Sequence, residues 1–278
     1  MRKKLAATDA GQNEADRRDH VESLGKGLAV LTCFGRQHPR LTLSEVSRLV
    51  PISPASARRA LLTLQGLGYL ESDGKHFWMS PRSLLVAQAF LASRPAPSLA
   101  QPLLDALSER TRESASLAQL LDDHAIIVGR STARRSLSTG LGIGSRLPAS
   151  SSALGRVLLA GLPQAEALAR VRAMPREKLT ARTVVDVRAL MKLLAQCRES
   201  GHASNDGELE IGVRSMAVPV RDRAGQVFAG MSIAVRMERM SMDEFREAFL
   251  PMLMRARDTL ERRLFPGGAA HPAQRPAP

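Results

Sequence analysis

Residues 20–80 carry three helical patterns followed by a hairpin signal, and this order constrains the fold more than any other feature of the sequence. Apolar residues recur at helical spacing over 21–34, and Thr42 with Glu45 forms the capping box of a second helix. Ser53-Pro54 supplies the N-cap and first position of a third helix. Asp73-Gly74 lies between two apolar, aromatic runs, which is typical of a hairpin turn. This order predicts a winged helix-turn-helix domain.

The third helix offers positive charge to a partner. Its buried apolar stripe is expected to comprise Ala57, Ala60, Leu61, Leu64 and Leu67. Arg58 and Arg59 lie off this stripe, and no acidic residue occurs between Glu45 and Glu71. In a winged helix-turn-helix, this helix enters the major groove of DNA, and the hairpin touches the backbone or the minor groove. We therefore expect double-stranded operator DNA as a partner, contacted by Ser53, Ser56, Arg58, Arg59 and Lys75. The alternative is a small three-helix domain that serves a protein interface.

Charge and composition mainly exclude classes of protein. The 278 residues carry a net charge of +13, but residues 1–80 hold only 12 basic and 8 acidic residues, so the charge alone argues weakly for DNA. Seven Phe, one Trp and one Tyr are few for a binder of single-stranded nucleic acid. Two distant cysteines exclude a disulfide framework. Without a membrane-spanning run or a secretory signal, we expect a cytoplasmic, nucleoid-associated protein that contacts no membrane.

Composition also divides the chain into segments. Residues 1–19 are polar and charged and 266–278 are rich in Gly, Ala and Pro, so we expect both to be disordered. A helix from Ser80-Pro81 ends before Pro95-Ala96-Pro97, which makes 81–97 a linker helix with a Pro-rich break. This linker joins the DNA-binding domain, 20–80, to a second domain, 98–265. Its apolar face predicts pairing with a second chain and comprises Leu84, Leu85, Gln88 and Leu91.

The second domain alternates between helical and strand patterns. Helices are expected over 98–112, 150–160, 163–171, 184–200 and 241–265. Strands are expected over 116–121, 125–128, 136–139, 213–220 and 226–236. The fold class is therefore α+β, with an antiparallel sheet and helices after the winged helix-turn-helix.

No catalytic constellation accompanies these elements. The six histidines are isolated, and the Gly-rich run 140–144 lacks the spacing of a nucleotide-binding loop. We therefore expect no catalytic residue, no metal and no cofactor. The serines at 150–152 combine hydroxyls with a helix start, which favours an anion site, although ordinary N-capping explains them as well. A serine-dependent hydrolase is an alternative, but the sequence offers it no positioned histidine.

Four stretches of sequence are similar to motifs of one known family. They are 21–28, 54–64 with Gly68-Tyr69, 147–160, and 201–220. They follow one another in the right order and at the right separations from about residue 20 to 264. The chain therefore resembles the IclR family of bacterial transcriptional regulators.

The resemblance implies a GAF-like effector domain that binds a small organic acid, in a homodimer or a tetramer. Arg134-Arg135 and the region 144–160 most resemble the branch that regulates aromatic-acid degradation. Members of that branch respond to protocatechuate, 4-hydroxybenzoate or β-ketoadipate. The alternative is a DNA-binding regulator whose second domain only oligomerises.

Effector-binding residues are carried over where positions match the family's pocket. They are Ser151, Ser152, Ala153, Leu154, Asn205, Asp206, Ser215 and Ser232. Arg134 is added to them as part of the basic pair near this helix start. The chain departs from the family at Asn205 and Gly207, where acids are common. We expect a carboxylate at the start of the helix 150–160, here called the signature helix, near Arg134, with an apolar remainder from Leu154, Val213 and Met216. For the hydroxyls of Ser215 and Ser232, hydrogen bonds to the sheet backbone are the alternative.

Overall fold

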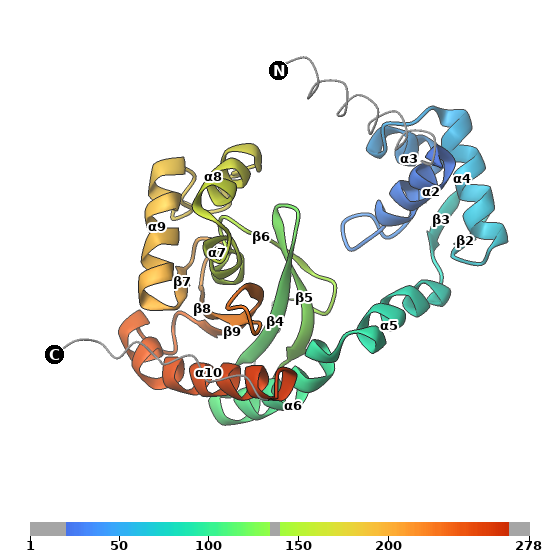
Figure 1. Cartoon of the computed structure of the whole chain (residues 1–278). Coiled ribbons are helices and arrows are strands. Elements are labelled where there is room, and N and C mark those ends of the chain that lie inside the picture. Colours follow the sequence, from blue (N-terminus) through green and yellow to red (C-terminus); the bar gives the residue numbers. More distant parts are fainter. Residues whose placement is uncertain (1–20, 134–139, 267–278) are drawn as a thin grey trace, which may run out of the picture. The chain divides into compact units, whose positions relative to one another are not determined.

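The computed structural model describes residues 21–133 and 140–266, in two compact units, Met1–Phe90 and Leu91–Pro278 (Figure 1). Several expectations lie outside the described residues. These are the disordered arm at 1–19, all but the first residue of the tail at 266–278, the strand at 136–139, and Arg134.

The first unit is a three-helix domain with a small sheet. Its elements are α2 (Glu22–Thr32), β1 (Leu41–Thr42), α3 (Leu43–Leu49), α4 (Pro54–Gly66), β2 (Leu70–Ser72) and β3 (His76–Met79). The predicted capping box of α3 and the Ser53 cap of α4 are both present. The sheet has the order β1-β3-β2, and the β2–β3 hairpin is the predicted wing. The buried core comprises Val30, Leu41, Val46, Val50, Ala57, Leu61, Leu70 and Phe77.

Two sequence expectations fail in this unit and its connector. Leu67, placed on the buried stripe of the third helix, is exposed because α4 ends at Gly66. The segment Pro95-Ala96-Pro97 was expected to be a Pro-rich break after the linker helix. Instead it forms the first turn of α6 (Pro95–Thr111). Proline is tolerated there because the first amides of a helix have no intrahelical acceptor. The short 3-10 helix Pro81–Ser83 and α5 (Leu84–Ser93) precede it.

The second unit is built on one antiparallel sheet of six strands in the order β6-β5-β4-β9-β8-β7. Its strands are β4 (Ser114–Leu121), β5 (His124–Ser131), β6 (Arg146–Pro148), β7 (Ala203–Asp206), β8 (Val213–Arg221) and β9 (Val227–Arg236). The hairpins β4–β5 and β8–β9 confirm the alternating patterns. The edge strands β6 and β7 were not predicted, since three or four residues carry too little periodicity.

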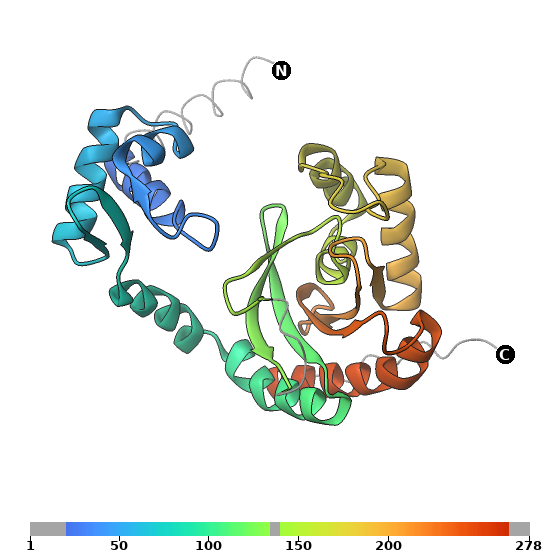
Figure 2. The same ribbon diagram turned by 180° about the vertical axis from the view of Figure 1, so that it is seen from behind.

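Helices cover both faces of this sheet (Figures 1 and 2). On one face, α6 and α10 (Met242–Leu264) pack against a core that includes Met216, Val218 and Ile233. On the other face lie α7 (Ala153–Ala160), α8 (Gln164–Ala173) and α9 (Val187–Ser200), over a core that includes Ala217. Because neighbouring strand residues face opposite sides, Met216 belongs to the α6–α10 side and does not line an effector site below α7, as the sequence had suggested.

Candidate functional site

Helix α4, the predicted third helix, and the wing present positive charge to solvent. Arg58 and Arg59 are both exposed, α4 has no acidic residue in its first turn, and neither arginine has an ion pair with a described residue. Ser53 caps the helix by accepting a hydrogen bond from the Ser56 amide at 3.3 Å, and the two hydroxyls are 3.0 Å apart. These contacts fix the start of α4 and leave its arginines available to a polyanion.

The wing is held by its own side chains. Asp73 Oδ1 accepts hydrogen bonds from the amides of Lys75 and His76, which lower the pKa of this carboxyl to about 2. The tight turn exposes the Lys75 side chain. At the base, the Arg40 guanidinium lies 4.3 Å from the centre of the Trp78 ring. Sequence reasoning missed Arg40, which adds a cation beside the wing.

The signature helix α7 begins at an internally satisfied cap. Ser152 Oγ accepts a hydrogen bond from the Gly155 amide at 3.0 Å and donates to the Pro148 carbonyl at 2.8 Å. This hydroxyl is a helix cap, so the N-capping interpretation holds for it. The Ser151 side chain is buried, and its Oγ has no hydrogen-bond partner within the described part of the chain.

Glycines allow α7 to lie unusually close to its surroundings. A Cβ on Gly155 would lie 2.2 Å from the Cα of Ala149, and one on Gly161 would lie 2.3 Å from the Cβ of Val227. On the sheet below, a Cβ on Gly230 would lie 2.8 Å from the Val157 side chain. Any larger residue at these positions therefore forces backbone or side chains to move.

A buried ion pair ties α7 to the segment after β7. Arg156 Nη1 and Nη2 donate to the two carboxylate oxygens of Glu208 at 2.7 and 2.6 Å. The same guanidinium donates to the carbonyls of Ser150 and Ser204. Glu208 Oε2 also accepts a hydrogen bond from the Val184 amide at 3.1 Å. This network holds the segment around Glu208, which leads into β8, against α7.

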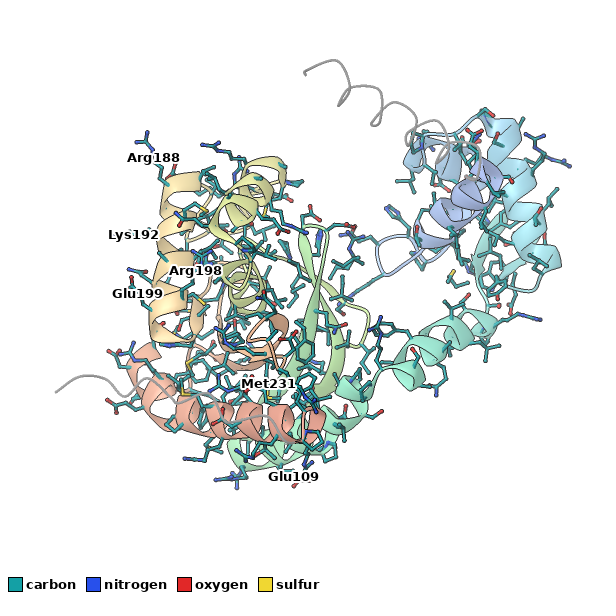
Figure 3. All side chains as sticks on the ribbon, in the orientation of Figure 1. Glu109, Arg188, Lys192, Arg198, Glu199 and Met231 are labelled. Atoms are coloured by element: carbon teal, nitrogen blue, oxygen red, sulfur yellow. The ribbon has the colours of Figure 1, made fainter. Side chains whose placement is uncertain are left out.

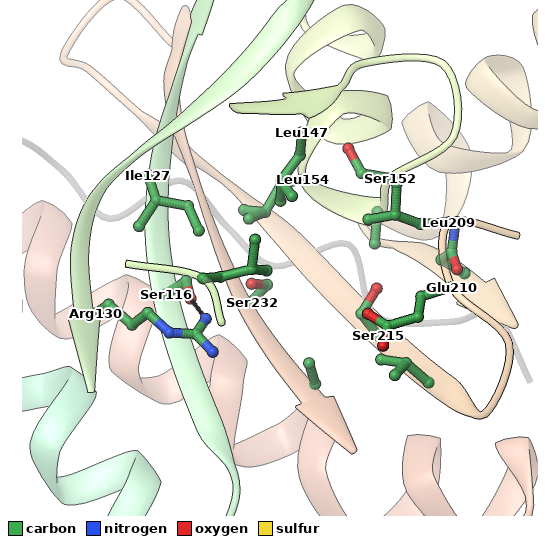
Figure 4. A pocket seen from close by; sticks show the side chains of 15 residues that line it. Ser116, Ile127, Arg130, Leu147, Ser152, Leu154, Leu209, Glu210, Ser215 and Ser232 are labelled. Carbon is green, nitrogen blue, oxygen red and sulfur yellow. Dashed lines mark hydrogen bonds between the residues drawn. The ribbon is translucent and has the colours of Figure 1, made fainter. Parts of the chain in front are cut away.

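A pocket of about 560 Å³, its open mouth included, lies between the start of α7 and the sheet (Figure 4). Its lining, mostly apolar with a few polar side chains, is typical of a small-molecule site. It is lined by Ser116, Ile127, Arg130, Leu141, Leu147, Ser152, Ala153, Leu154, Asn205, Leu209, Glu210, Val213, Ser215, Ser232 and Ala234. Of the residues carried over from the family, this list contains Ser152, Ala153, Leu154, Asn205, Ser215 and Ser232.

Two carried-over residues do not line the pocket. Asp206 pairs with Arg182, whose Nη1 lies 2.8 Å from its Oδ2, and with Arg214. Ser151 is absent from the lining, and its carbonyl accepts a hydrogen bond from Asn205 Nδ2. Asn205 Oδ1 also accepts from the Glu208 amide at 3.2 Å, so Asn205 braces the loop as well as lining the pocket.

Strand register places a polar row across the floor of the pocket. Arg130 on β5 is directly opposite Ser116 on β4, which is directly opposite Ser232 on β9. Arg130 Nη1 donates to Ser116 Oγ at 2.8 Å, whereas Arg130 Nε is buried without a hydrogen-bond partner. Burial lowers the pKa of this guanidinium. Arg130 therefore brings a partly unsatisfied cation into the pocket.

Arg130 and Ser116 were missed by sequence reasoning. A usable signal existed: Arg130 is the one charged residue in the otherwise apolar run 125–130 of the predicted hairpin. The hydroxyls of Ser215 and Ser232 donate no hydrogen bond to the sheet backbone in residues 21–133 and 140–266, so that alternative finds no support. Both hydroxyls are available to a ligand.

Within the described ranges, the structure has neither a side-chain group for a metal ion nor a membrane-spanning helix. No group of three or more His, Cys, Asp and Glu side chains in this part of the chain could hold a metal ion. Among the described helices, none combines the length and apolar character needed to cross a bilayer.

Comparison with known proteins assigns both units. Residues 23–74 match the IclR helix-turn-helix domain, and residues 88–262 match the bacterial transcriptional regulator IclR C-terminal domain. Both models describe transcriptional regulators and not enzymes, which excludes the serine-hydrolase alternative.

Individual relatives agree with this assignment. The Pca regulon regulatory protein of Pseudomonas putida is 36% identical, over 89% of this chain and 85% of its own length. A crystal structure of a putative transcriptional regulator from Rhodococcus sp. RHA1 superimposes with a TM-score of 0.76 at 38% identity, covering 88% of this chain and 98% of its own. An inducer-binding domain of the PobR transcription factor from Acinetobacter, a double mutant in complex with 3-hydroxybenzoic acid, is 27% identical with a TM-score of 0.56, over 59% of this chain and 97% of its own. The chain belongs to the IclR family of bacterial transcriptional regulators, with an N-terminal DNA-binding domain and a C-terminal effector domain.

Proposed function

We propose that this regulator controls genes of aromatic-acid catabolism and that a small aromatic carboxylic acid, bound in the pocket below α7, changes its affinity for operator DNA. Residues 20–80 bind the operator through α4 and the wing, and 98–265 bind the effector. The kinship with the Pca regulon regulatory protein supports this field of regulation. The related PobR domain was crystallised with a hydroxybenzoic acid, which supports an aromatic carboxylate.

The chemical class of the effector is inferred from the surroundings of the Arg130 side chain. The Arg130 guanidinium is half-buried, its Nε is buried without a hydrogen-bond partner, and no described residue supplies a counter-ion. This is costly, and a ligand carboxylate would supply the counter-ion through paired N–H donors. The hydroxyl of Ser116 already orients the guanidinium. The apolar remainder, from Ile127, Leu147 and Leu154, suits an aromatic ring. The proposal therefore moves the carboxylate from the start of α7, where Ser152 is occupied as a cap, to Arg130.

Assembly as a dimer, or a dimer of dimers, completes the proposal. None of the residues of α5 is buried, and Leu84 and Leu85 are 69% and 62% exposed. Pairing of α5 with a second copy covers this apolar face and lets two α4 helices reach successive major grooves about 34 Å apart. Effector and operator affinities are then coupled by the same factor in both directions. Such a protein acts in the cytoplasm, at the nucleoid.

Calorimetric titration of the full chain with benzoate and 4-hydroxybenzoate tests the effector site. Arg130→Gln is expected to weaken both acids at least tenfold, because each charged hydrogen bond contributes about 1.5–3 kcal/mol. Arg188→Gln makes the same exchange at an exposed position of α9 and is the control (Figure 3). Wild-type affinity in the Arg130 variant, or equally tight binding of uncharged benzamide, contradicts the site.

The same acids are then added to an operator complex in an anisotropy titration. We expect the acid that binds the pocket to change operator affinity, and the Arg130 variant to lose that response while it still binds DNA. If bound acids leave operator affinity unchanged, the second domain does not act as an effector sensor, and the alternative of a purely oligomerising domain replaces this proposal.

A further inference from the structure

One acidic side chain lines the pocket together with Arg130. Glu210 lies in the loop between β7 and β8, which is bracketed by Gly207 and Gly212 with φ of +73° and +85°. These left-handed conformations favour glycine and set the path of the loop. In Figure 4, Arg130 enters the pocket from β5 and Glu210 from this loop, on opposite sides, with Ser232 between them in this view.

Glu210 differs in its contacts from the two other acids nearby. Glu208 is neutralised by Arg156, and Asp206 by Arg182 and Arg214. Glu210 has no side-chain hydrogen bond or ion pair with any residue that the structure describes. Arg156, Arg182 and Arg214 thus pair with other acids, and the exposed Glu210 carboxylate is a negative group of the pocket lining that no described residue neutralises.

The sheet sets the separation of the two charged ends. Arg130 is on β5, whereas Glu210 precedes β8, three strands further across the sheet. Adjacent strands are about 4.8 Å apart, so β5 and β8 are separated by about 14 Å across the sheet, and both side chains line the pocket between them. The serines of the intervening strands supply neutral hydroxyls along this line. An elongated small acid that meets Arg130 at one end therefore presents its other end to Glu210.

We propose that Glu210 selects the effector by the charge of the end remote from Arg130. Its carboxylate accepts a hydrogen bond from a distal hydroxyl, as in a para-hydroxylated benzoate, and repels a second carboxylate, as in a dicarboxylic acid of similar length. Rejection by like charge is a common source of specificity. This inference rests on the proposed function, because it requires a carboxylate at Arg130.

The test compares 4-hydroxybenzoate with benzene-1,4-dicarboxylate by calorimetry on the full chain. Wild-type protein is expected to prefer the hydroxy acid by about fivefold, which corresponds to the repulsion of two like charges about 4 Å apart in water, because the Glu210 carboxylate is exposed. Glu210→Gln is expected to reduce the preference to about twofold or less, chiefly through tighter binding of the dicarboxylate. Glu199→Gln, which removes the same charge from an exposed position on α9, is expected to keep the wild-type preference (Figure 3).

The outcomes separate this inference from the proposed function. Equal affinities of the two acids for wild-type protein, or an unchanged preference in Glu210→Gln, overturns the role of Glu210 while the Arg130 site stands. Loss of the preference in Glu199→Gln also overturns it, because the effect is then long-range. Failure of every carboxylate to bind wild-type protein overturns both.

Discussion

Arg156→Met removes the buried cation that joins α7 to the loop before β8. The side chains of Arg156 and Glu208 are only 2% and 11% exposed, so solvent screens the pair little. Removing one partner leaves a buried carboxylate, which costs about 3–5 kcal/mol. The carbonyls of Ser150 and Ser204 lose their donor as well, so we expect the upper part of this range.

Two spectroscopic signals localise this loss of stability. Trp78 is the only tryptophan of the chain and lies in the first unit, so its fluorescence reports unfolding of the DNA-binding unit. Far-UV circular dichroism reports both units. In urea, Arg156→Met is expected to shift the dichroism transition of the second unit to lower concentration, while the Trp78 transition stays in place.

A double variant supplies the control. Arg156→Met with Glu208→Met replaces the ion pair by apolar groups and is expected to be more stable than Arg156→Met, because no unpaired charge remains. If the single variant loses less than about 1 kcal/mol, the pair behaves like a solvent-exposed one and the reasoning from burial is wrong. A double variant no more stable than the single one contradicts the assigned role of the unpaired carboxylate.

Three further predictions concern packing, DNA and assembly. Gly155→Ala is expected to destabilise the second unit by about 1–3 kcal/mol or more in thermal melts, whereas Gly142→Ala, which meets open space, is the control; equal midpoints contradict the close approach to Ala149. Arg58→Ala or Arg59→Ala is expected to weaken operator binding by about 1–3 kcal/mol if that arginine reads a base, and unchanged affinity in both removes α4 from the interface. Leu85→Glu is expected to shift the light-scattering mass toward the monomer, and a parent chain that is monomeric at micromolar concentration refutes the pairing.

Local signals predicted the fold well. The capping boxes at Thr42 and Ser241 and the Ser53 cap start helices where the sequence indicated, because side chain and backbone are only three residues apart. The Asp73-Gly74 turn likewise specifies the wing from adjacent residues. The start of α6 was misjudged because prolines serve both as helix breakers and as first-turn residues.

The candidate site was harder to predict, because it depends on register between strands. Arg130 meets Ser116 and Ser232 only through the pairing of β5, β4 and β9, which no local pattern specifies. Met216 was assigned to the wrong face for the same reason: one position along β8 separates the pocket side from the α6–α10 core. Ser152 was identified correctly as a polar residue at a helix start, but its hydroxyl is consumed by the cap.

The close seating of α7 has a consequence for how a signal can leave the pocket. With Gly161 against Val227 and Val157 against Gly230, α7 is packed closely on β9, and Gly155 packs against Ala149 in the turn that precedes the helix. Packed interiors of this kind change by discrete repacking and not by gradual deformation. We therefore expect an effector in the pocket to displace the loop of Glu210, or the strands that carry Arg130 and Ser116, more readily than α7. We thus expect α7 to stay in place when the effector binds, and the sheet and the loop of Glu210 to carry the change of conformation.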